Sequence, residues 1–169
     1  MAAKVALAMV VLFAGDPARA AGILAECRAL SRAHGERWWL GHTLAASAMT
    51  ALTLGDVPTA NGYAREGLRI GVDLNDPLGV AGALERLAWL AAAGQDHERA
   101  ARLLGAADRQ WRAIGQTMYG SAPLLAGHER CVASAREALG DAAYRTQFRR
   151  GAALTLDNAI SYALRDPST

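Results

Sequence analysis

The chain has 169 residues, of which 52% are hydrophobic and 20% charged, and its formal net charge is +2. This balance excludes a disordered polyelectrolyte, and the chain is long enough to bury a core without disulfides or metals. The sequence pI near 8.8 is only weak evidence for a nucleic-acid partner. Cys27 and Cys131 have no second cysteine at ligand or redox spacing, so we expect buried or half-buried thiols in a reducing, cytoplasmic compartment.

The first apolar run extends from Lys4 to Phe13 and imitates the basic and apolar parts of a secretory signal. However, Gly15-Asp16 ends this run in the same register in which Gly55-Asp56 ends a later one. This register favours a first helix at 2–14. The run is also shorter than the about 20 apolar residues that a membrane span needs, so we expect no membrane contact.

Similar corners recur every 40 residues along the chain. An aspartate is followed four positions later by an alanine in Asp16/Ala20, Asp56/Ala60 and Asp96/Ala100. A fixed period of this size is typical of stacked helical hairpins, each of which buries its apolar faces against its neighbours. The sequence therefore predicts an all-α fold, a solenoid of stacked helical hairpins. We expect three hairpins over 1–115. They are formed by the first helix at 2–14 and by helices at 17–34, 37–54, 57–73, 77–93 and 97–114.

Local signals mark the ends of these helices. Asp16-Pro17 and Asp76-Pro77 each place an N-cap carboxylate before a proline at the first helical position. Gly35, Asn75 and Gly115 stand where a helix should end in the left-handed conformation. The small residue after each corner, such as Ala60, should let paired helices pack closely.

After Gly115 the repeat lapses. We expect a loop over Gln116 to Pro123, helices at 124–139 and 142–150, and a last helix that begins after Thr155 and runs to Arg165. Residues 116–165 should form a C-terminal helical cap, because a solenoid must cover its terminal apolar face. Residues 166–169 resemble the start of a polar linker.

The first helix is apolar around most of its circumference, which suits a helix with neighbours on both sides. The simplest interpretation is that the chain is an excised piece of a longer array. The alternative is a homodimer through this helix.

Three stretches carry a resemblance to one group of proteins: residues 98–114 (ERAARLLGAADRQWRAI), 136–140 (REALG) and 154–164 (LTLDNAISYAL). Together they resemble the C-terminal end of the tetratricopeptide-like region in actinobacterial ATP-dependent transcriptional regulators of the LuxR and AfsR types, over about 70 residues. The resemblance implies a right-handed α-solenoid of tetratricopeptide-like hairpins, signal reception by the helical array and control of an attached nucleotide-binding switch domain. The parts for binding ATP or DNA are missing from this sequence, because no Gly-x-x-x-x-Gly-Lys-Ser/Thr loop occurs and no helix-turn-helix follows Leu164.

The sequence offers little for catalysis. The four histidines show no paired metal-ligand spacing; they are His34, His42, His97 and His128. Neither a Gly-x-Ser-x-Gly elbow nor a cysteine nucleophile signature occurs. We therefore expect no enzyme activity, no cofactor and no metal. Acidic residues are interspersed among the arginines of 99–112 and 145–150, which favours a solvated face over direct contact with nucleic acid.

Five residues are candidates for a recognition surface that binds a protein partner or a small ligand: Trp38, His42, Met49, Glu85 and Trp89. Trp38 and His42 are four residues apart, as are Glu85 and Trp89, so each pair shares a helix face. If the first helix of each hairpin lines the concave side, these residues lie along it. The alternative is that Trp38, Trp39 and Trp89 belong to the hairpin core. The expected role is that of a non-catalytic sensor or protein-interaction region; the alternative is a free-standing scaffold.

Overall fold

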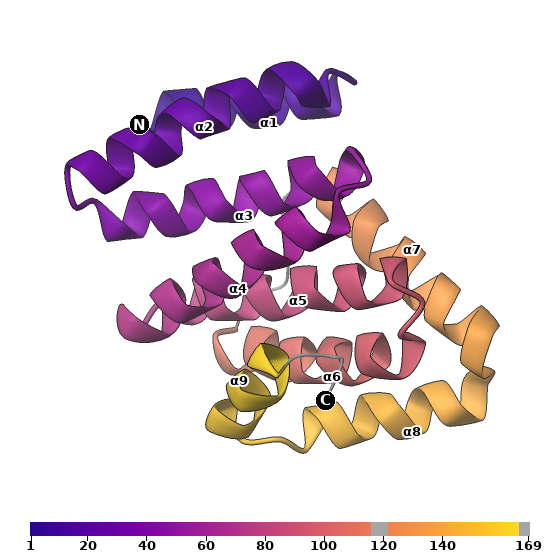
Figure 1. The fold of residues 1–169 in the computed structure, drawn as a ribbon. Coiled ribbons are helices and arrows are strands. Elements are labelled where there is room, and N and C mark those ends of the chain that lie inside the picture. The colour runs from indigo at the N-terminus through magenta and orange to yellow at the C-terminus, as the bar shows by residue number, and fades with distance from the viewer. Residues whose placement is uncertain (116–121, 166–169) are drawn as a thin grey trace. The chain divides into compact units, whose positions relative to one another are not determined.

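The computed structural model describes residues 1–115 and 122–165, and within these ranges the chain forms nine α-helices and no strand (Figure 1). The all-α prediction is therefore confirmed for the described residues, whereas the solenoid arrangement stays a prediction. The chain divides into two compact units, residues 1–79 and the part from Val80 onward. The predicted functional division at residue 115 stays a prediction.

The first unit contains α1 (Ala2–Phe13), α2 (Pro17–Ala33), α3 (Arg37–Thr53) and α4 (Val57–Asp73). The second contains most of α5 (Pro77–Ala93), then α6 (His97–Ala113), α7 (Ala122–Leu139), α8 (Asp141–Ala152) and α9 (Leu156–Leu164). The first six predicted helices agree with these bounds to within one residue. Of the predicted loop over 116–123, residues 122–123 belong to α7 and the rest lies outside the described residues, as does the predicted linker at 166–169.

The corners between helices end one helix and start the next with the same backbone pattern. Gly15 has φ +91°, and the N–H of Asp16 donates to the carbonyl of Val11, five residues earlier. The carboxylate of Asp16 accepts from the N–H of Arg19 at 3.0 Å. This pattern combines a left-handed C-cap with an N-cap, so both sets of orphaned helix-end groups gain partners. Gly55-Asp56 repeats it, with the carboxylate of Asp56 3.1 Å from the N–H of Thr59.

The other predicted corner residues behave as expected. Gly35, Asn75 and Gly115 all have positive φ, and Asp76 and Thr155 cap their helices through side-chain oxygens. At the Gly94-Gln95-Asp96 corner the left-handed residue is Gln95, at φ +64°, rather than the glycine before it. A glutamine there carries a steric cost that glycine avoids.

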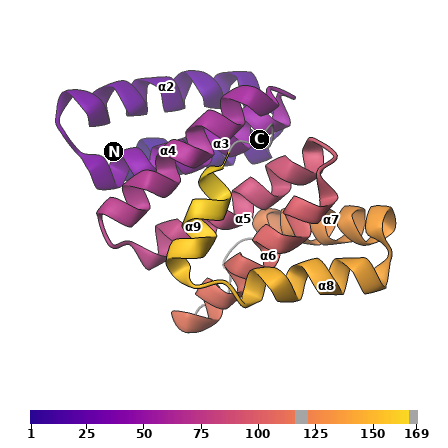
Figure 2. The same ribbon diagram turned by 60° about the horizontal axis from the view of Figure 1, so that its bottom comes forward.

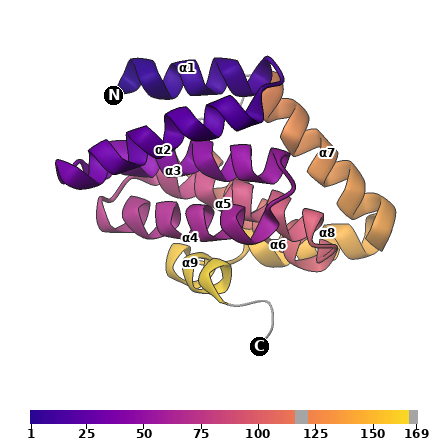
Figure 3. The ribbon, with the colours of Figure 1, turned by 45° about the horizontal axis from the view of Figure 1, so that its top comes forward.

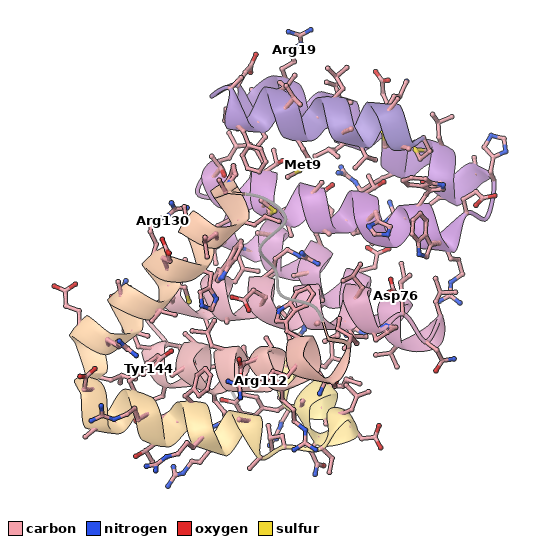
Figure 4. The ribbon with its side chains drawn as sticks, turned by 180° about the vertical axis from the view of Figure 1, so that it is seen from behind. Met9, Arg19, Asp76, Arg112, Arg130 and Tyr144 are labelled. Carbon is pink, nitrogen blue, oxygen red and sulfur yellow. The ribbon has the colours of Figure 1, made fainter. Side chains whose placement is uncertain are left out.

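In the first unit, consecutive helices lie side by side (Figure 3). Leu24 of α2 is fully buried and packs against Ala8 of α1 and Ala46 of α3, so one leucine fills the space among three helices. Met9 lies beside this cluster, between α1 and its neighbours, whereas Arg19 points into solvent (Figure 4). Ala20 and Ala60, which follow the corners, are fully buried, as a close helix contact requires.

In the second unit, α8 runs alongside α6 (Figure 2). Two buried glycines mark the contact. A Cβ at Gly105 would lie 2.8 Å from the carbonyl carbon of Phe148, and a Cβ at Gly151 would lie 2.8 Å from that of Arg102. Because the obstructing atoms are backbone, only glycine permits the two helices to approach this closely. No helix among the described residues combines the length and apolar character needed to cross a bilayer.

Candidate functional site: an aromatic edge and a buried polar cluster

The first group of candidate residues lies at the start of α3. Trp38 is 48% exposed, and its ring meets the ring of His42 edge-on with centroids 4.1 Å apart. Trp39 adds a third ring, with its centroid 4.8 Å from that of Trp38. We call Trp38, Trp39 and His42 the aromatic edge. The predicted shared face of Trp38 and His42 is confirmed by this contact.

Met49, the third candidate of α3, has a different environment. It is half-buried and packs against the apolar cluster of Val11, Leu12 and Ala20 from α1 and α2. Its side chain therefore contributes to the packing of three helices in the first unit. Arg37, the residue before Trp38, forms an ion pair with Asp73 of α4.

The remaining two candidates lie in the second unit and are buried. Glu85 accepts a hydrogen bond from the indole N–H of Trp89 at 3.1 Å, and its Oε1 is 2.7 Å from Nδ1 of His128 on α7. Trp89 is only 9% exposed, and its ring abuts Gly127, where an added Cβ would lie 3.0 Å from the ring. The shared face of Glu85 and Trp89 is confirmed, but its function here is to join α5 to α7. We call Glu85, Trp89 and His128 the buried polar cluster.

Burial and hydrogen bonding shift the pKa values of several ionisable groups around this cluster. The hydrogen bond to Glu85 raises the pKa of His128 above its ordinary value, against the opposing effect of burial. Burial lowers the pKa of Arg86 to about 10, with the negative charge of Glu85 opposing the shift, and raises the pKa of Cys131 to about 12. Cys131 is therefore a protonated, unreactive thiol at neutral pH. Tyr144, buried on α8 (Figure 4), also has a raised pKa because of burial.

Sequence reasoning missed His128 as a partner of Glu85. The two residues are 43 positions apart, and no motif links them. The Glu85–Trp89 spacing indicated a polar pair on one face, but nothing local identified what would cover it. Within the described ranges, no group of three or more His, Cys, Asp or Glu side chains is arranged to hold a metal ion.

The prediction of a solvated arginine face is wrong for Arg99 and Arg102. One guanidinium nitrogen of Arg99 donates to the carbonyls of Tyr162, Ala163 and Arg165 at the end of α9, at 3.0–3.2 Å. Arg102 donates to the amide oxygen of Gln147 on α8, and both guanidinium groups lie over the ring of Tyr162. These arginines fasten α8 and α9 to α6, which intrahelical spacing alone could not reveal.

The described residues thus define an all-helical protein with an exposed aromatic edge and a buried polar cluster. The chain is 34% identical over 131 residues to proteins named "Putative HTH-type transcriptional regulator" from Mycobacterium bovis and Mycobacterium tuberculosis. The similarity covers 76% of this chain but only 14% of each relative. No protein-family model matches the sequence, and no solved structure matches it significantly.

Proposed function

We propose that this chain is a non-catalytic sensor or protein-interaction segment of a bacterial transcriptional regulator. The observation that carries the proposal is its similarity to mycobacterial proteins that bear the name of HTH-type transcriptional regulators. Because the chain spans a small share of their length, the regulator's nucleotide-binding and DNA-binding domains would lie elsewhere in the parent protein. This agrees with the resemblance of residues 98–164 to regulators of the LuxR and AfsR types.

The recurring corners support a tetratricopeptide-like architecture. Asp16, Asp56 and Asp96 cap α2, α4 and α6 in the same way, and each of these helices has 17 residues. Equal helices joined by equal corners are what a right-handed α-solenoid requires, because each hairpin must present the same surfaces to its neighbours. In such a solenoid a partner or small ligand binds the concave face.

The aromatic edge is the part of the candidate surface that a partner can reach. Trp38 exposes nearly half of its surface beside an imidazole, and the preceding residue, Arg37, forms an ion pair with Asp73. Together these residues offer apolar contact area and polar groups on neighbouring positions. Glu85 and Trp89 would act differently, by fixing α5 against α7. Binding at the edge would shift the tilt of the hairpins, and with it the equilibrium of an attached switch domain.

A genomic Trp38→Ala substitution tests this role in the organism that encodes the chain. The measurement is the whole-transcriptome profile, with immunoblotting to establish equal protein abundance. Leu78→Ala is the matched control, because Leu78 is 47% exposed and therefore comparably accessible. We expect Trp38→Ala to change the expression of a defined gene set and Leu78→Ala to leave it unaltered.

The failures of this test are informative separately. Identical profiles for the two substitutions would remove Trp38 from the binding surface. An unchanged profile after deletion of the whole segment would remove the regulatory role. If deletion of the segment abolished a protein complex that contains it but left the transcriptome unchanged, the result would instead support the role of a free-standing scaffold.

A further inference from the structure

One face of α1 is apolar and exposed. Val10 is 65% exposed, and Leu7 and the small Ala3 and Ala6 lie on the same side of the helix, opposite the buried Ala8. The face carries no charged side chain. Isolated exposed leucines are ordinary, but a charge-free stripe along a whole helix indicates a contact surface.

Helix α3 shows what the same face is like when another helix covers it. Counted back from the corner aspartates Asp16 and Asp56, Val10 of α1 corresponds to Thr50 of α3, and Leu7 corresponds to Ser47. Thr50 is only 1% exposed, and Ser47 is equally hidden. Equivalent positions are therefore buried in α3 and exposed in α1.

The cover on α3 is provided by α2, through two identifiable contacts. Leu24 packs against Ala46, the counterpart of the exposed Ala6. Nη1 of Arg28 donates to Oγ of Ser47 at 2.6 Å. The face of α3 thus accepts one leucine and one hydrogen-bonding cation from the helix that lies on it.

We propose that the α1 face binds an amphipathic helix from outside residues 1–169, which lies on α1 as α2 lies on α3. This helix would place a leucine against Ala6, as Leu24 stands against Ala46. In the place of Arg28 it would carry an apolar residue. Leu7 has no oxygen to accept a hydrogen bond, so a guanidinium there would lose water without gaining a partner.

The size of the face argues against a second copy of this chain as the occupant. A helix of 12 residues is about 18 Å long, so two copies meeting through α1 alone would bury only a few hundred Å². Stable pairs of subunits usually bury about 1,200–2,000 Å². A helix held by its own hairpin partner, as α2 is held by α1, does not depend on this one contact.

The test adds such a hairpin to the chain and measures whether the residue preferred at position 28 of the added hairpin depends on the residue at position 7 of α1. Residues 1–40 are duplicated ahead of the full chain, which preserves the spacing between α2 and the helix it covers. Four versions combine Arg28 or Arg28→Leu in the added copy with Leu7 or Leu7→Ser in the original α1. The measurements are the melting temperature and hydrogen exchange of the original α1 amides.

With Leu7, we expect Arg28→Leu in the added copy to raise the melting temperature by about 2–4 °C and to slow exchange in α1. With Leu7→Ser the preference should reverse, because the serine can accept the hydrogen bond of Arg28 as Ser47 does. A preference for the same residue in both backgrounds overturns the proposal. So does a dimer of the natural chain in sedimentation analysis that Val10→Glu dissociates, because the face would then belong to a second copy.

Discussion

Gly151 offers the sharpest test of the packing in the second unit, because the sign of the effect depends on a single contact. In an exposed helix, replacing glycine with alanine stabilises the protein by about 0.5–1 kcal/mol through backbone entropy. At Gly151 the new methyl would lie 2.8 Å from the carbonyl carbon of Arg102, and closer still to its oxygen. Ordinary carbon contacts are about 3.5–4.0 Å, so α8 would have to move by roughly 0.7 Å or more.

Such a displacement disturbs the whole contact between α6 and α8, including the matching approach at Gly105. We expect Gly151→Ala to destabilise the protein by about 1–3 kcal/mol, the usual cost of overpacking. In a protein of this size that corresponds to a fall of roughly 2–12 °C in melting temperature.

The assay is chemical unfolding followed by circular dichroism, with hydrogen exchange of α6 and α8 to locate the loss. Gly22→Ala and Gly62→Ala are matched controls, since both glycines are helical and exposed with nothing within 4 Å of an added Cβ. These controls should become slightly more stable. A gain in stability for Gly151→Ala equal to theirs would refute the close approach of α6 and α8.

Three further outcomes follow from the structure. Because the hydrogen bond to Glu85 raises the pKa of His128, this pair should stabilise the protein fully below about pH 6.5 and lose its effect as the pH rises through the raised pKa. The unfolding free energies of the wild type and of His128→Phe, measured between pH 5.5 and 8.5, should therefore converge at the higher pH. Ala60→Leu should cost about 1–3 kcal/mol in urea unfolding, since Ala60 is fully buried between helices, and an unchanged midpoint would contradict the register of α4. Trp89→Ala should cost about 3–5 kcal/mol, whereas Trp38→Ala should alter thermal stability little; equal losses for the two would place Trp38 in the core.

The helix boundaries could be predicted closely because their determinants are local. An aspartate that caps the next helix and a residue that accepts positive φ stand within two positions of each other at Gly15-Asp16 and Gly55-Asp56. These residues satisfy backbone groups in their immediate neighbourhood, whatever the rest of the chain does. The same holds for Thr155, whose hydroxyl accepts from the N–H of Asn158.

The interior of the second unit could not be predicted, because its determinants are distant in sequence. Gly105 and Gly151 look like ordinary helix glycines until α6 and α8 are brought together. Likewise, Glu85 gains His128 as a partner only because α7 packs against α5. Helical periodicity identifies faces, but it does not identify which face meets which.

The two candidate tryptophans illustrate how neighbours, rather than spacing, decide between core and surface. Each has a polar partner one helical turn away on its own helix, His42 for Trp38 and Glu85 for Trp89. Trp89 is covered because α7 presents Gly127, whose missing side chain leaves room for the indole. Trp38 stands in the first turn of α3 and keeps nearly half its surface in water. Trp38 therefore gains less from folding than Trp89 does, and the proposal that a partner binds the aromatic edge is the first to test.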